Sequence, residues 1–214
     1  MSERLKAIYR AIVVFLTILT GLIFFTFLTS PFVFKMIIKP FQFSKITKLS
    51  SGTIFHNYTI LVNYLLNPFV KSLNFPNFTQ SASGLKHFAE VKNLLLINEL
   101  LFFIGNILCL FIFYDLNRTK LYFIMKNSFR FLSFIPLVLV ILFVLFDFHN
   151  FFYKFHLILF RNSDWIFDPA KDPIINVLPE DFFKIEFIIF FSLWCVILLF
   201  FNLWINHQIK RNCH

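Results

Sequence analysis

The sequence predicts an all-α membrane protein with four transmembrane helices and an extracellular cap of helices and loops, forming a single membrane domain over residues 1–214. Composition is the first reason. Of the 214 residues, 58% are hydrophobic, 36 are Phe and only 14% are charged, which is far from the usage of soluble domains. Second, four stretches are long enough to cross a bilayer core, which takes about 20 apolar residues.

The four predicted spans cover residues 11–34, 93–114, 131–148 and 187–209. The first contains no charged residue, and its apolar run is too long for a signal peptide and ends in aromatic residues, so we expect it to remain as an anchor. The second and third reach spanning length only by including one carboxylate each, Glu99 and Asp147.

Basic residues next to the spans indicate the orientation. They precede the first span, fill the short link between the second and third, and follow the fourth: Arg4, Lys6, Arg10, Arg118, Lys120, Lys126, Arg130, Lys210 and Arg211. The positive-inside rule places these segments and both termini in the cytoplasm. Residues 35–92 and 149–184 then face outward and form the cap. This orientation accounts for the net charge of +9, and the dispersed Lys and Arg residues predict no nucleic-acid partner.

The first outer segment contains two helix signals. One is an apolar and aromatic helical face that ends at Asn67-Pro68 and fits a helix lying on the membrane. The other is the run from Ser81 to Ser83, which offers an N-cap for a helix that continues into the second span and carries His87. The apolar face consists of Asn57, Tyr58, Leu61, Val62, Tyr64 and Leu65.

The second outer segment is expected to begin as a helical extension of the third span over residues 146–160. Asp168-Pro169 and Asp172-Pro173 then break it. Pro179, followed by Glu180 and Asp181, is typical of a helix start and leads into the fourth span.

Titratable residues gather at the predicted outer surface. Glu99, Asp147 and Glu186 lie toward the outer ends of their spans, where the plainest interpretation is that they mark the bilayer boundary. Three histidines share this layer. The inner halves of the spans contain no acid or base apart from His207 at the cytoplasmic boundary, which argues against a proton path through the membrane and favours a surface-facing site.

Each outer histidine has two interpretations. His87 and Glu90 stand three apart on a helix, so the carboxylate can orient the imidazole or form an ordinary surface pair. His149 and His156 are seven apart and share a helix face with aromatic residues, so either can be a packed interfacial histidine.

Missing motifs narrow the chemistry. The sequence has no G-x-S-x-G elbow, phosphate-binding Gly loop, H-E-x-x-H helix or Cys cluster. Cys109 and Cys195 fall within spans, and Cys213 lies at the cytoplasmic end. We therefore expect no metal and no cofactor. If the protein is an enzyme, a His pair is the likeliest reactive group, and the nucleophile comes from the substrate.

Three motifs carry a family resemblance. They are "HFAEVK" (residues 87–92), "FHLILFRNSDWIFDPAKDP" (155–173) and "LPEDFF" (178–183). With the preceding helix that contains Tyr58 and Tyr64 and the order of the four spans, they resemble the bacterial lipoprotein intramolecular transacylase family. The family more often has Asp where this chain has Glu90.

The resemblance implies an acyltransferase of the cell membrane, active at the outer face and dependent on the lipid bilayer. Its substrate is a diacylglyceryl lipoprotein, whose sn-2 acyl chain moves to the α-amine of the terminal cysteine and leaves a lyso-form lipoprotein. The family's catalytic histidines fall on His87 and His156. One takes the amine proton and the other protonates the glyceryl oxygen, and the sequence does not assign which. Candidates for the substrate-binding lining are Tyr58, Tyr64, Glu90, Phe155 and Trp165, although membrane-interface anchoring also explains such aromatic residues.

Two other function classes stay open at this stage. A phospholipid hydrolase or an intermolecular acyltransferase at the outer leaflet would use the same residues. A non-enzymatic membrane assembly protein would need only the aromatic cap. The sequence does not give the oligomeric state, for which a monomer is the default.

Overall fold

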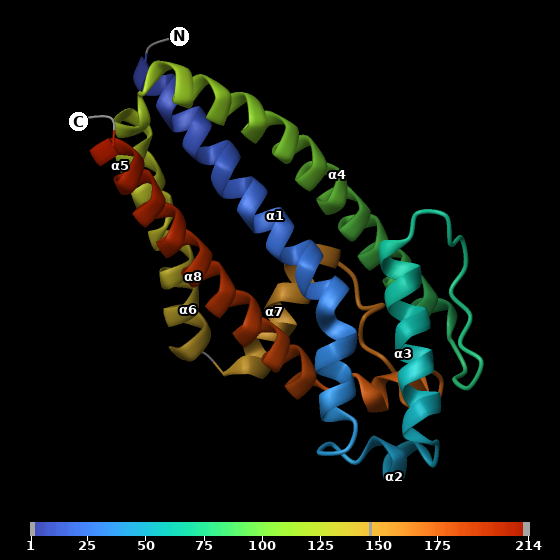
Figure 1. Cartoon of the computed structure of the whole chain (residues 1–214). Coiled ribbons are helices and arrows are strands. Elements are labelled where there is room, and N and C mark those ends of the chain that lie inside the picture. Colours follow the sequence, from blue (N-terminus) through green and yellow to red (C-terminus); the bar gives the residue numbers. More distant parts are fainter. Residues whose placement is uncertain (1–2, 146, 212–214) are drawn as a thin grey trace. The chain divides into compact units, whose positions relative to one another are not determined.

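A computed structural model describes residues 3–145 and 147–211 of the chain. Over these residues all regular secondary structure is helical, and Figure 1 follows it in chain order. The elements are α1 (Glu3–Ile37), α2 (Phe43–Thr47), α3 (Ser51–Leu66), α4 (Ala82–Thr119), α5 (Tyr122–Leu132), α6 (Phe134–Leu145), α7 (Phe148–Phe160), the 3-10 helix η1 (Pro173–Val177) and α8 (Glu180–Arg211).

Four helical segments are long and apolar enough to cross a membrane, which confirms the predicted fold class. They are α1, α4, the α5–α6 region from Tyr122 to Phe143, and α8. Large apolar side chains on these helices stay exposed, among them Leu110 at 71% and Phe200 at 69%. Such side chains are typical of helices whose surroundings are lipid rather than water.

The third span differs from the prediction in two ways. It is divided at Ser133 into α5 and α6, with Pro136 in the first turn of α6, where the missing N–H is tolerated. The predicted helical extension of this span into the second outer segment is wrong. Helix α6 ends at Leu145, and α7 begins at Phe148 with Asp147 as its N-cap, whose carboxylate accepts a hydrogen bond from the Asn150 N–H. An N-terminal carboxylate satisfies free N–H groups and therefore favours a new helix start here.

The described chain divides into two compact units. The span unit comprises residues 3–23, 98–145 and 189–211, and the cap unit comprises residues 24–97 and 147–188. The long helices α1, α4 and α8 each contribute residues to both units.

Small and amide side chains bring the helices of the span unit together. A Cβ added at Gly105 would meet the Thr17 side chain, so α1 and α4 approach closely at this point. Nearby, the Asn98 amide donates a hydrogen bond to the Thr20 carbonyl oxygen at 2.9 Å. Small residues and interhelical amide hydrogen bonds are the usual determinants of helix packing in membranes.

The cap unit has an aromatic core around α3. Tyr58 stacks on Phe34 with ring centroids 3.8 Å apart, contacts Phe182 edge-on at 5.7 Å, and donates a hydrogen bond to Ser30 Oγ at 2.7 Å. Helix α3 ends at Leu66, as predicted from the following Asn-Pro pair. Its apolar face is covered by protein, so the expectation that this face lies on the bilayer is wrong. All six residues of this face are buried, and rings from α1 and α8 pack on its Tyr58.

The start of α4 is bound to the second outer segment. The predicted N-cap is confirmed, since Ser81 Oγ accepts a hydrogen bond from the Gly84 N–H at 2.9 Å. The carboxylate of Asp172 accepts from the Ser81 N–H at 2.7 Å and from its hydroxyl at 2.6 Å. A Cβ at residue 84 would collide with Asp172 Oδ1. Gly84 is therefore required by the close approach of a carboxylate that also complements the helix dipole.

Candidate active site

The cap unit brings His87 and His156 together. His87 lies near the start of α4, ahead of the span predicted from residue 93, and His156 lies on α7. Their ring centroids are 5.9 Å apart, with 39° between the ring planes. At this separation a small reacting group can contact both imidazoles.

A hydrogen bond within α7 defines the tautomer of His156. Its Nδ1 lies 2.8 Å from the carbonyl oxygen of Phe152. Because a carbonyl oxygen can only accept, Nδ1 carries the proton when the ring is neutral. The remaining nitrogen, Nε2, then has the lone pair. The geometry thus presents Nε2 of His156 as a base.

His87 is enclosed by aromatic rings and is only 7% exposed. Phe160 and Phe167 contact its ring edge-on, with centroid separations of 4.6 Å and 5.6 Å. Its Nδ1 is buried and has no hydrogen-bond partner among the residues that the structure describes. A buried polar atom of this kind is costly unless it serves a function.

Burial keeps both imidazoles neutral. It lowers the pKa of His87 from 6.5 to about 4, with a smaller contribution from the neighbouring charge of His156. Burial also lowers the pKa of His156, against the opposing effects of the Phe152 carbonyl and of Glu180. Desolvation disfavours the charged imidazolium in each case. Both rings are therefore able to accept a proton at neutral pH.

Trp165 and Phe155 both lie against His156. The indole ring of Trp165 is 4.7 Å from the imidazole centroid at 33°, and the Phe155 ring is 5.6 Å away at 78°. Phe152, one helical turn before the histidine, is closer still at 4.1 Å. Two of the five predicted lining residues thus contact a predicted catalytic histidine.

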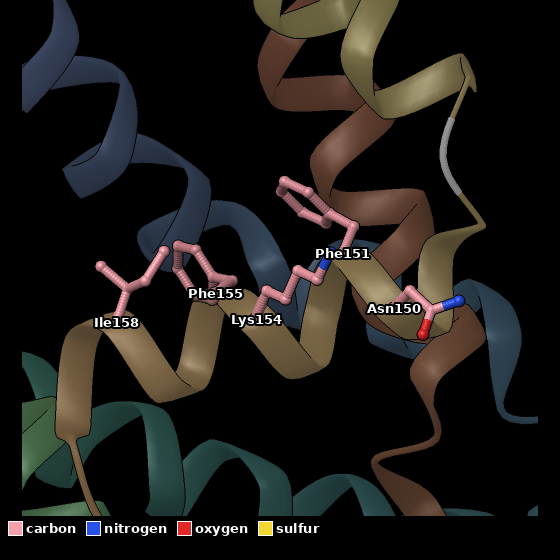
Figure 2. A pocket seen from close by; sticks show the side chains of 5 residues that line it. All are labelled: Asn150, Phe151, Lys154, Phe155 and Ile158. Atoms are coloured by element: carbon pink, nitrogen blue, oxygen red, sulfur yellow. The ribbon is translucent and has the colours of Figure 1, made fainter.

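A groove runs along one side of α7. It encloses about 210 Å³, and its lining is predominantly apolar. Figure 2 shows the five lining side chains projecting from α7, at spacings that place them on one side of the helix. They are Asn150, Phe151, Lys154, Phe155 and Ile158. Neither histidine lines the groove, and helical periodicity places His156 on the opposite side of α7 from the lining residues.

Glu90 does not contact His87 through any hydrogen bond that the structure records. Both of its carboxylate oxygens accept from the Asn162 amide, at 3.0 Å and 3.1 Å. The predicted contact of Glu90 with His87 is therefore not observed, and Glu90 instead connects α4 to the loop after α7. A carboxylate at position 90 can accept hydrogen bonds from the Asn162 amide as readily as from an imidazole N–H.

The other predicted residues lie apart from the histidine contacts. Tyr58 belongs to the aromatic core described above, and burial raises its pKa. Tyr64 is 6% exposed and lies under the Lys92 ammonium, which is 4.3 Å from the ring centroid. His149 is exposed and pairs with Glu180, Nδ1 to Oε1, at 2.8 Å.

Sequence reasoning missed four residues of this arrangement. Phe152 and Phe160 lie four residues before and after His156, so helical spacing alone would have placed them on its face. Phe167 and Asn162 lie in a loop, where no periodicity exists to predict their contacts.

The described residues contain no group of three or more His, Cys, Asp or Glu side chains that could hold a metal ion. What the site does contain is a neutral imidazole pair surrounded by aromatic rings. Such a site can move a proton between two heteroatoms of a bound lipid-like molecule while excluding water.

Comparisons with known proteins agree with this picture. A family model described as "Lipoprotein intramolecular transacylase Lit" matches residues 8–183. The in meso structure of the membrane integral lipoprotein intramolecular transacylase Lit from Bacillus cereus matches with a TM-score of 0.81 and 22% identity, covering 96% of this chain and 98% of that chain. Two structures of the same B. cereus protein, with one histidine replaced by arginine or alanine, match with TM-scores of 0.77 and 21% identity. They cover 97% of this chain and 93% and 95% of theirs. None of the curated protein sequences is significantly similar.

Proposed function

Because this chain belongs to the lipoprotein intramolecular transacylase family, we propose that it converts a diacylglyceryl-cysteine lipoprotein into its lyso-form. The acyl chain at sn-2 of the glyceryl group moves to the α-amine of the same cysteine. The observation that carries the proposal is the pair of neutral imidazoles, the buried His87 and the half-buried His156, with ring centroids 5.9 Å apart.

The reaction exchanges one bond for another. The amine nitrogen attacks the ester carbonyl carbon, a C–N bond forms, and the C–O bond to the glyceryl oxygen breaks. One proton leaves the amine, and one reaches the glyceryl oxygen. An α-amine has a pKa near 8, so a fraction is already neutral at pH 7 and a weak base suffices.

His156 is the proposed base. Its Nε2 lone pair receives the amine proton, and the Phe152 carbonyl stabilises the resulting imidazolium through the Nδ1–H. His87 is the proposed donor to the glyceryl oxygen. It takes over the amine proton from the His156 imidazolium and passes it to the departing glyceryl oxygen, so both rings end neutral, and the burial that lowers the pKa of His87 favours this release.

The reaction is proposed to be intramolecular because no protein side chain is proposed as the nucleophile. No protein nucleophile is proposed, because Cys109 and Cys195 belong to the span unit and the recorded ring contacts of the histidine pair are with Phe and Trp side chains. Holding an amine and an ester of one molecule in attack geometry contributes roughly 7–11 kcal/mol toward the barrier. The rings around the histidine pair provide that restraint.

The α7 groove is the proposed place for an acyl chain. Its lining is apolar, and its volume of about 210 Å³ is below the roughly 300–1,000 Å³ of pockets that enclose a whole ligand. It therefore accommodates part of a chain, and the rest of the chain extends into lipid.

A crossover experiment tests the function. The purified protein is given two substrates in one vesicle preparation, one with isotopically labelled acyl chains and one with a labelled peptide. We expect only parental combinations of label in the N-acyl product at every enzyme concentration. Product that carries both labels would move the protein to the intermolecular acyltransferases, and release of free fatty acid without N-acylation would make it a hydrolase.

The proposed orientation has both termini in the cytoplasm and the histidine pair at the outer face. Single cysteines introduced at Ser50 and Asp168 should react with an impermeant thiol reagent in whole cells, and one at Asn117 should react only after lysis. The reverse pattern would place the site on the cytoplasmic side and exclude a substrate of the outer leaflet.

A further inference from the structure

Asn162 uses nearly all of its polar groups to connect three parts of the cap unit. It follows Arg161, the left-handed C-cap of α7 with φ 54°. Its amide nitrogen donates to both oxygens of Glu90 on α4, and its side-chain oxygen accepts from the Asp164 N–H at 3.1 Å. Its backbone carbonyl accepts from the indole N–H of Trp165 at 2.9 Å.

The indole bound in this way is the one that lies on His156. Trp165 also contacts the Tyr153 ring at 5.2 Å and 70°, so rings on α7 restrain one side of the indole and the carbonyl of Asn162 restrains its N–H. Indole rings are large and rigid, and a hydrogen bond at the N–H removes their main rotational freedom. The orientation of Trp165 therefore depends on where the Asn162 backbone is held.

A second contact between α4 and this loop is weaker. Lys86 pairs with Asp164 at 2.5 Å, but the Lys86 side chain is 60% exposed. Exposed ion pairs contribute little to stability. The Asn162–Glu90 contact is partly buried and uses both carboxylate oxygens, so it provides the more definite link.

We propose that Asn162 is a positioning residue for the acyl transfer, which holds Trp165 against the His156 ring by anchoring the loop to Glu90. This inference rests on the function proposed above. Asn162 acts through the indole and touches neither histidine in any recorded contact. Its effect is to keep one face of the imidazole covered and the base correctly aimed.

Loss of the Asn162–Glu90 contact is expected to change the pKa of His156. If Trp165 withdraws, His156 gains water on one face, and the desolvation that lowers its pKa is reduced. The charged or titratable groups around it, His87 on α4 and Glu180 on α8, remain in place. The pKa of His156 then rises toward its ordinary value, and the acid limb of the activity profile moves to higher pH.

The test compares Asn162→Ala with Ser163→Ala, an exposed neighbour in the same loop. Both are made in the full chain and reconstituted in vesicles with a diacylglyceryl-cysteine peptide. For Asn162→Ala we expect kcat to fall about 10- to 100-fold, as for a small misplacement of a reacting group, with KM little changed and the acid limb at higher pH. Ser163→Ala should match the unsubstituted protein.

Fluorescence gives a readout that does not depend on turnover. In a background with Trp194→Phe and Trp204→Phe, the emission comes from Trp165 alone. Asn162→Ala should increase its quenching by iodide, and Ser163→Ala should not. Glu90→Gln keeps an oxygen that accepts from the amide, so it should retain most activity and protection, whereas Glu90→Ala should reproduce Asn162→Ala without adding to it in the double variant.

Three results would overturn the inference. They are a kcat and acid limb for Asn162→Ala equal to those of Ser163→Ala, unchanged quenching of Trp165, or fully additive losses in the double variant with Glu90→Ala. An unsubstituted protein that forms no N-acyl product would instead contradict the proposed function itself, so the two failures are distinguishable.

Discussion

The span unit and the cap unit are stabilised by different kinds of contact. In the span unit, helices meet at small residues and single amide hydrogen bonds, such as Gly105 beside Thr17 and Asn98 on the Thr20 carbonyl. In the cap unit, partly buried charged groups bind backbone or amide partners, as Asp172 does at the start of α4. A span side chain that is replaced by another apolar one therefore keeps similar lipid-like surroundings. Changes in the cap remove a specific partner.

The largest expected effect is on the histidine pair. Replacing His87 or His156 with Ala should lower turnover by about 10²- to 10⁴-fold, the usual contribution of a positioned acid or base. Initial rates of N-acyl product formation, together with yield and thermal unfolding in detergent, check this.

His149→Ala is the matched control, because His149 pairs with Glu180 at the surface. It should keep most activity. Near-normal turnover of either variant of the pair would remove that residue from the mechanism, and an inactive but folded His149→Ala would move the site along α7.

The second-largest effect is expected at the start of α4, where the Asp172 carboxylate binds Ser81. In Gly84→Ala the new methyl group meets the Asp172 carboxylate, so the loop must shift or the side chain must leave its partners. We expect the free energy of unfolding to fall by about 1–3 kcal/mol, as for other overpacked sites. Thermal unfolding in detergent measures it.

Gly52→Ala in α3 is the control for this variant, since a Cβ there has only Ser50 Oγ nearby, at 3.8 Å. Its stability should be unchanged or slightly higher, because Ala favours a helix over Gly. Equal losses for the two variants would show that the approach of Asp172 is not what requires Gly84.

The cap unit should also respond to acid through His87. Its pKa is about 4 in the folded chain and 6.5 as the ordinary value, so the unfolded state binds more protons between these limits. The stability that this group contributes is present above pH 6.5 and is lost as pH falls toward 4, on the order of 3 kcal/mol in total. Unfolding midpoints of the protein and of His87→Phe, measured from pH 7 to pH 4.5, should diverge accordingly. Parallel curves would show that His87 is not desolvated in the folded protein.

The smallest effect is expected in the span unit. Asn98→Leu removes the hydrogen bond to the Thr20 carbonyl, and interhelical bonds of this kind average about 0.6 kcal/mol in membranes. Unfolding in mixed micelles should show a loss near that size. A loss of several kcal/mol would mean that polar contacts are as decisive in the spans as in the cap.

The sequence predicted those features that depend on local signals. Hydropathy located the four spans, Ser81 marked the start of α4, and Pro179 with its following acids marked the start of α8. The break between α6 and α7 was missed, because the capping by Asp147 interrupts an otherwise continuous apolar pattern.

The candidate site was less accessible to sequence reasoning. The positions of His87 and His156 in the sequence did not predict that the two side chains lie close together. Only the family resemblance selected them. The partner of Glu90 lies in a loop, where the fold rather than the pattern decides the contact. Tyr58 shows the same limit, since its position on an apolar face suited a core as well as a substrate lining.

Helix α4 is unbroken from the Asp172 tie to the end of the second predicted span. At about 1.5 Å per residue, His87 therefore stands roughly 9 Å along the helix from residue 93, where the apolar stretch is predicted to begin. The continuous helix therefore fixes the distance of His87 from the start of the apolar stretch. A thicker or thinner bilayer changes the height of the glyceryl ester relative to the imidazole, at a modest energetic cost per ångström of mismatch. For the proposed reaction we therefore expect the rate to depend on lipid chain length, even for lipids that are not substrates.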